Sequence, residues 1–219
     1  MYAKLAHRLA SACVVTAGIV CSTPSVHAQE NDRLFGVLPN YSTVDGQPAD
    51  DGSQTAPAIS TRLSFRLASL SSFDPVVFPY VGLMTAISAD RGANYGDRYM
   101  RAFADNSIGN FMTTAVVPTL TNQDPRYFRS GEGGIFRRMA YAASRSAITR
   151  TRAGHAAFNI SEIGGNLAGA GIANLYHDPI DRTVGATMSR WGLQVMGDTV
   201  ANELKEFWPD IHARLRRSR

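Results

Sequence analysis

Small and apolar residues recur at helical spacing along most of this chain. In the segment 160–176, Gly165, Gly169 and Ala173 lie four residues apart, so on a helix they would form one smooth strip. Each glycine costs a helix about 1 kcal/mol relative to alanine, and small residues at every fourth position let a second helix approach closely. We therefore predict that 160–176 is the central helix of an all-α bundle.

The same spacing predicts further helices at 62–71, 97–116, 135–149 and 181–207. The segment 74–88 is apolar on nearly every side, so we expect it to be buried. No window alternates between apolar and polar residues for long enough to predict a strand. The fold class is therefore all-α, a compact bundle of about six helices that pack through glycine and alanine.

The last of these helices, 181–207, carries two apolar stripes rather than one. Two stripes indicate two packing partners, and Pro209 is expected to end the helix. The first stripe contains Val184, Met188, Trp191 and Val195, and the second contains Leu193, Met196, Val200, Leu204 and Phe207.

Residues 1–28 have the pattern of a secretory signal. Lys4 and Arg8 make a basic start, and 9–20 form an apolar core that is too short to span a bilayer. Short residues precede a cleavage position at Ala28. We predict cleavage after Ala28 and export, with the mature protein in the periplasm or associated with the outer membrane.

The rest of the chain divides by composition into three parts. Gly, Pro, Asp, Ser and Gln are frequent in 29–60, which is typical of a flexible N-terminal arm. The helical bundle domain follows at 61–211, and 212–219 form a basic tail.

Cysteine usage and charge narrow the possible chemistry. Cys13 and Cys21 both lie in the predicted signal, so the exported chain would have neither a disulfide nor a thiol. Cys21 as a lipid-modified cysteine is the alternative, which the bulky Val20 before it disfavours. The formal net charge is only +4, and Lys4 and Arg8 contribute to it. With export, this weak charge argues against nucleic acid as a partner.

The segment 62–71 combines an apolar face with basic residues. Leu63, Leu67 and Leu70 share one face, and Arg62 and Arg66 lie beside it. Such a basic amphipathic helix either covers the core or lies on a membrane surface.

Common catalytic motifs are missing from the sequence. There is no G-x-S-x-G elbow, no phosphate-binding Gly-Lys-Ser/Thr loop and no H-E-x-x-H zinc pair. After the predicted signal the histidines are His155, His177 and His212. Three scattered histidines without cysteine make a weak metal site, so we predict neither a metal nor a cofactor.

The best candidate constellation is His155, Asn159, Glu162 and Asn166. These residues would share one face if the central helix extended back to His155, because they are spaced by four, three and four. His155 and Glu162 would then act as base and orienting group, with an asparagine binding developing negative charge. The alternative is structural: Asn159 and Glu162 cap the helix and Asn166 makes an interhelical hydrogen bond.

Polar residues outside the central helix could complete such a site. Asp124 and Arg126 lie in a polar, aromatic connector before the helix at 135–149. Asp105 belongs to a charged row with Asp97 and Arg101, and Asn110 has apolar neighbours, so its amide needs a partner. We therefore take Asp124 as a further catalytic candidate, and Arg126, Asn159, Asn166, Asp105 and Asn110 as binding candidates.

Several stretches together resemble a family of exported bacterial proteins that has no assigned function. They are RLFGVLPNY at 33–41, IGNFM at 108–112, QDPRYFR at 123–129, NISEIGGN at 159–166 and EFWPDI at 206–211. The resemblance covers most of 33–211. It implies that these segments belong to one folded unit, and it implies no activity.

These patterns favour a non-enzymatic cell-envelope bundle whose partners are membrane lipid or further copies of itself. The first alternative is a hydrolase or lipid-modifying enzyme that uses Asp124, His155 and Glu162. The second is a carrier that holds an apolar ligand between its helices.

Overall fold

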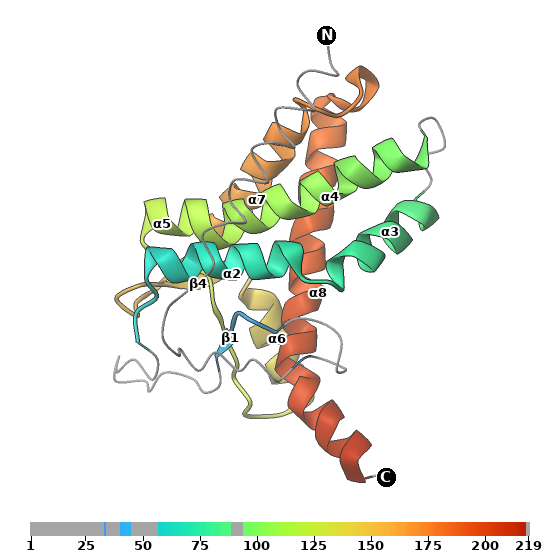
Figure 1. Cartoon of the computed structure of the whole chain (residues 1–219). Coiled ribbons are helices and arrows are strands. Elements are labelled where there is room, and N and C mark those ends of the chain that lie inside the picture. Colours follow the sequence, from blue (N-terminus) through green and yellow to red (C-terminus); the bar gives the residue numbers. More distant parts are fainter. Residues whose placement is uncertain (1–32, 34–39, 45–56, 89–93, 218–219) are drawn as a thin grey trace.

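The longest element of the structure is helix α8 (Val184–Arg217), and two further helices pack along it. Helix α7 (Ile160–Ala173) and helix α6 (Ile135–Ser144) contact different parts of α8 (Figure 1). This computed structural model describes residues 33, 40–44, 57–88 and 94–217, and it confirms the all-α fold. The predicted signal and most of the predicted arm lie outside the described residues.

A second layer crosses α7 and α8. Helix α4 (Tyr95–Phe111) continues through a π-helical turn, η2 (Met112–Val116), into α5 (Val117–Thr121). Helix α2 (Thr61–Phe73) packs along α4 and η2, and α3 (Val77–Ile87) packs on α4 (Figure 1). A proline ordinarily ends a helix, but Pro118 lies in the first turn of α5. Proline is tolerated in a first helical turn, where its missing N–H needs no partner.

The glycine strip on α7 faces another backbone, as predicted. A Cβ atom on Gly165 would lie 3.0 Å from the Cα of Thr113 and 3.1 Å from the carbonyl oxygen of Met112. A Cβ on Gly169 would lie 3.6 Å from the Cα of Gly109. Helix α7 therefore contacts the backbones of α4 and η2 directly, which a residue larger than glycine at position 165 would prevent.

Short strands occur where the sequence predicted helix or connector. β4 (Ile148–Thr151) pairs antiparallel with β5 (Ala156–Phe158) and with β2 (Gln123–Asp124), and β1 (Thr43–Val44) pairs parallel with β3 (Tyr127–Phe128). The predicted helix at 135–149 is therefore too long, since α6 ends at Ser144. The β-branched side chains between 148 and 151 favour the extended backbone.

Helix α8 also differs from its prediction. It continues through Pro209 to Arg217, and the rings of Trp208 and His212 stack one turn apart across the proline, with centroids 5.4 Å apart. The two predicted packing partners are confirmed, since α7 and α6 both pack on α8, although only Glu206 and Trp208 of α8 are fully buried. Leu193, Met196 and Val200 of the second stripe are exposed. A short 3-10 turn, η3 (Pro179–Asp181), precedes α8.

The most buried large side chains of the described core are polar. The carboxylate of Glu206 accepts hydrogen bonds from the Tyr127 hydroxyl at 2.8 Å, the Gly131 N–H at 2.9 Å and the Arg138 Nε at 3.0 Å. Burial alone would raise the pKa of Glu206, but these donors outweigh burial and lower it. Glu206 thus fastens the 127–131 connector and α6 to α8.

Candidate functional site

A polar cavity of about 140 Å³ lies where the two helical layers meet the short strands. Its walls are formed by η2, the 125–128 connector, β4, the first turn of α7 and the middle of α8. A cavity of this size holds several waters or one small molecule. Since most of the lining side chains are charged or polar, any occupant must be polar as well.

Four of the residues proposed from the sequence line this cavity: Asn110, Arg126, Asn159 and Glu162. Asn166 joins them indirectly, because its amide nitrogen donates to Glu162 Oε1 at 2.8 Å. The structure therefore brings together proposed site residues from three separate parts of the chain.

Two of the proposed catalytic residues are not among the lining residues. His155 lies on the exposed turn between β4 and β5, so its placement on the face of the central helix was wrong. Gly154 has φ 91° and turns the chain there, and α7 begins only after Asn159, whose side chain caps it by accepting from the Glu162 N–H at 3.0 Å. Asp124 is buried and accepts from the Arg126 Nε at 3.0 Å.

One end of the cavity holds a carboxyl pair. The Asn166 amide donates to Glu162 and, at 3.0 Å, to Asp198 Oδ2 of α8. Burial, followed by the charge of Asp198 and a hydrogen bond with it, raises the pKa of Glu162 to about 9. Glu162 therefore keeps its proton to a higher pH than an ordinary carboxyl group does.

Lys205 lines the same end of the cavity. Burial lowers its pKa, while the charges of Asp198 and Glu162 act in the opposite direction. Sequence reasoning missed both Asp198 and Lys205. They are seven residues apart on α8 and so lie on one face, but nothing local distinguishes them from ordinary exposed charges.

The other end of the cavity is basic. The guanidinium of Arg145 lies 4.6 Å from the centroid of the Tyr141 ring, and that of Arg150 lies 5.2 Å from the centroid of Phe128. Burial, with the nearby charge of Arg145, lowers the pKa of Arg150, although the surrounding acceptors partly oppose this. Sequence reasoning proposed neither arginine as a site residue; in the structure Arg145 follows the end of α6 and Arg150 belongs to β4.

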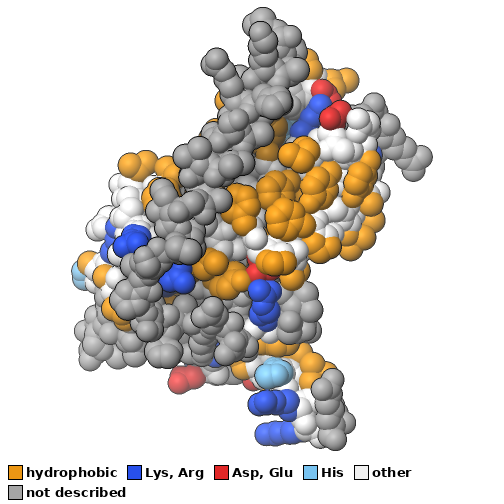
Figure 2. All heavy atoms as spheres, viewed as in Figure 1, with side chains coloured by type: hydrophobic (Ala, Val, Ile, Leu, Met, Phe, Trp, Pro, Cys, Tyr) orange, Lys and Arg blue, Asp and Glu red, His pale blue; other side chains and the backbone are white. Residues whose placement is uncertain are grey.

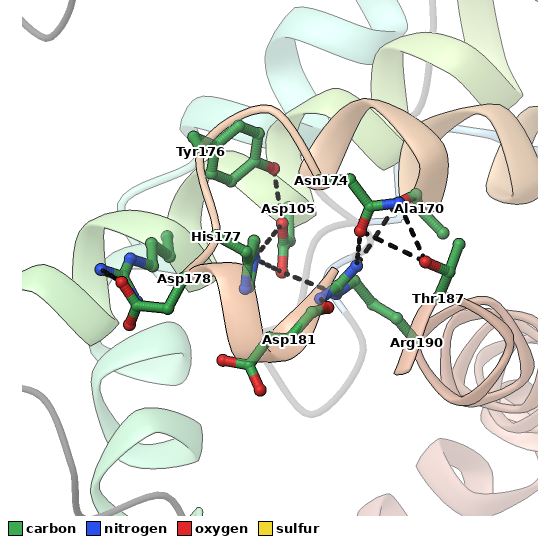
Figure 3. Close-up of polar contacts among 10 residues, drawn as sticks. Asp105, Ala170, Asn174, Tyr176, His177, Asp178, Asp181, Thr187 and Arg190 are labelled. Carbon is green, nitrogen blue, oxygen red and sulfur yellow. Dashed lines mark hydrogen bonds and ion pairs between the residues drawn. The ribbon is translucent and has the colours of Figure 1, made fainter. Parts of the chain in front are cut away.

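Asp105 belongs to a separate cluster at the far end of α7 (Figure 3). Its carboxylate contacts His177 Nε2 at 3.0 Å and the Tyr176 hydroxyl. Arg190 of α8 lies 3.9 Å from Asp105 and donates to the Ala170 carbonyl in the last turn of α7. A cation at a helix C-terminus is favourable. This cluster therefore stabilises the C-terminal end of α7 and joins α7 to α4 and α8.

Arg101, which the sequence pattern paired with Asp105, is instead bound to another acid. Both of its terminal nitrogens donate to Asp178 in the connector between α7 and η3. The charged row on α4 is therefore not paired within its own helix. It reaches across to the chain that follows α7, which only the packing of α4 beside α7 makes possible.

The outer surface carries many large apolar side chains. Figure 2 shows apolar side chains gathered over α3 and the adjoining part of α4. Seven exposed residues make up this surface, which we name the α3 face: Phe78, Tyr80, Leu83, Met84 and Ile87 of α3, with Tyr95 and Met100 of α4. The prediction that 74–88 is buried is thus wrong for one side of α3.

The chain matches no protein-family model, no curated protein and no solved structure at a significant level. Its function must therefore be inferred from the geometry of this molecule alone.

Proposed function

We propose that this protein is a non-enzymatic component of the cell envelope that sits on a membrane through the α3 face. The observation that carries the proposal is the distribution of side chains. Among the described residues, the largest fully buried side chains include Gln123, Glu206 and Asn166, whereas Leu83 and Ile87 are 58% and 67% exposed. Polar groups inside and apolar groups outside are typical of a protein with a lipid-facing surface.

Helix α3 has the composition that lipid contact requires. It contains no charged residue, and its exposed side chains are all apolar. Its polar contacts point inward: the Tyr95 hydroxyl donates to the Gly82 carbonyl at 2.9 Å, and Arg98 donates to the Thr85 carbonyl. These bonds hold α3 against α4 and leave a purely apolar outer side.

The helix before α3 fits the same arrangement. Within the described chain, no single helix is both long and apolar enough to cross a membrane, but α2 and α3 pass together as a pair bent by 55°. Arg62 and Arg66 of α2 are exposed. Basic side chains beside an apolar surface favour binding to anionic lipid at the interface.

An enzyme built on Asp124, His155 and Glu162 finds less support, since only Glu162 faces the cavity. A carrier of an apolar ligand finds little support at the same cavity, because the walls are mainly polar.

Vesicle binding tests the proposal. The purified chain is mixed with vesicles of phosphatidylcholine and phosphatidylglycerol, and the bound fraction is measured by flotation. The double variant L83D/I87D should bind at least about tenfold more weakly, because charge replaces two apolar side chains worth about 1.5–3 kcal/mol each when buried. L175D is the control, since Leu175 is also exposed but follows the end of α7.

A second copy of the chain is the competing occupant of the α3 face. Light scattering after size-exclusion chromatography measures the mass of the wild type and of L83D/I87D. If the double variant dissociates a dimer while vesicle binding is unchanged, the surface is a protein interface and the membrane proposal is wrong.

A further inference from the structure

We infer that the polar cavity binds the oxyanion group, phosphate or carboxylate, of a small polar molecule, and that Arg145 and Arg150 hold it. This site is independent of the α3 face. The inference rests on the placement of the two arginines in the cavity wall and on the groups around them.

The two guanidiniums face the cavity without a carboxylate partner. Among the described residues, no carboxylate oxygen lies within 4.0 Å of either side chain. Within the described part of the chain, the guanidinium of Arg145 donates only to the neighbouring Ser144 hydroxyl, at 3.2 Å and 3.3 Å, and that of Arg150 interacts with the Tyr141 hydroxyl. Partly buried guanidiniums are normally paired, so these two have capacity left for an anion.

Arg145 and Arg150 also repel one another, since the charge of Arg145 contributes to lowering the pKa of Arg150. The Arg145 guanidinium lies over the Tyr141 ring and the Arg150 guanidinium over the Phe128 ring, and these contacts favour the observed positions of both groups. Two neighbouring, mutually repelling guanidiniums suit phosphate or carboxylate oxygens, which accept paired N–H bonds and neutralise the charge.

Two other possible anion-binding groups at the cavity, Arg126 and the first turn of α7, are already occupied. Arg126 is paired with Asp124. At the first turn of α7, the Ser161 N–H donates to Gln123 Oε1 at 2.9 Å and the Glu162 N–H donates to Asn159 Oδ1. Anion binding at this cavity therefore depends on Arg145 and Arg150 rather than on the helix N-terminus.

The acidic end of the cavity restricts the rest of the ligand. Asp198 is an acceptor there, and Glu162 and Lys205 are beside it. A ligand that reaches this end must carry hydroxyl or amino groups that can hydrogen-bond to them. The ligand class is thus a small hydroxylated or aminated molecule with one phosphate or carboxylate group, either free in solution or as the headgroup of a lipid.

Calorimetric titration of the full chain tests the inference with inorganic phosphate, glycerol 3-phosphate and acetate, against chloride at equal ionic strength. The wild type should bind at least one oxyanion with a dissociation constant below about 10 mM. R145Q and R150Q should each raise that dissociation constant about tenfold or more. R137Q is the matched control, because Arg137 is exposed on α6 and outside the cavity wall.

Folding of each variant is checked by circular dichroism. If a glutamine variant does not fold, R145K and R150K keep the charge but lose the fork, and should still weaken binding. Vesicles that contain phosphatidic acid distinguish a lipid headgroup from a free ligand. If the ligand is a headgroup, vesicle binding depends on the two arginines and glycerol 3-phosphate binds weakly. If the ligand is a free molecule, glycerol 3-phosphate binds well and vesicle binding does not depend on the arginines.

Either of these patterns supports the site. The inference is overturned if no oxyanion binds more tightly than chloride and the vesicles do not bind either. It is also overturned if R137Q loses as much binding as R145Q and R150Q.

Discussion

The raised pKa of Glu162 leads to a defined pH dependence of stability. Glu162 sits beside Asp198 at the polar cavity, and burial followed by the charge of Asp198 raises its pKa to about 9. The ordinary value is 4.5, so between these values the folded protein keeps a proton that the unfolded chain releases. Stability from this group is therefore fully present below pH 4.5 and is lost as the pH rises.

The magnitude follows from the width of the pH window. One bound proton changes the free energy of unfolding by about 1.4 kcal/mol per pH unit. Between pH 5 and pH 7 the wild type should lose about 2 to 3 kcal/mol through Glu162. The lowered pKa of Lys205 acts in the opposite direction, so the prediction is made for the difference from a variant that keeps Lys205.

The variant E162Q has no proton to lose, and glutamine can still accept from Asn166. Urea unfolding of both proteins at pH 5, 6 and 7 gives the difference between their free energies of unfolding. Histidines and acids shared by the two proteins cancel in this difference. It should shift in favour of E162Q by about 2 to 3 kcal/mol across the window.

Glu132 provides the control, because it is exposed in the loop before α6. E132Q should track the wild type at all three pH values. If the difference between E162Q and the wild type is constant from pH 5 to pH 7, Glu162 is ionised in the folded protein, and the description of the carboxyl pair is refuted.

Two further pairs of substitutions test the packing by urea unfolding. G165A should destabilise the fold by about 1 to 3 kcal/mol, because its Cβ would meet the backbone of η2. G171A, with open space at its Cβ, should instead be neutral or stabilise by up to about 1 kcal/mol; equal effects of the two would contradict the close approach of the helices. E206Q should cost about 3 to 5 kcal/mol, because it removes the fully buried one of the two carboxylate partners of Arg138. D210N removes the more exposed partner of Arg138 and should cost less than about 1 kcal/mol. A larger loss of stability in D210N than in E206Q would contradict the role of Glu206.

Part of the candidate site was predictable from the sequence. Asn159, Glu162 and Asn166 lie within two turns of one helix, so helical periodicity alone indicated that they would act together. The capping by Asn159 was considered as an alternative, and it is what the structure contains. The same cap excludes His155 from the helix, because a capping residue has non-helical backbone angles.

The sequence by itself determined the positions of most helices, the cap of α7 and the glycine strip, because each depends on residues within a few positions of one another. It did not determine that one side of α3 is exposed, since an apolar helix is compatible with either a protein core or a lipid surface. Only the tertiary structure decided that Glu162 meets Asp198 and Lys205 and that Arg145 and Arg150 face the same cavity. These side chains come from separate elements, and their distances are set by how α7, α8 and the strands pack.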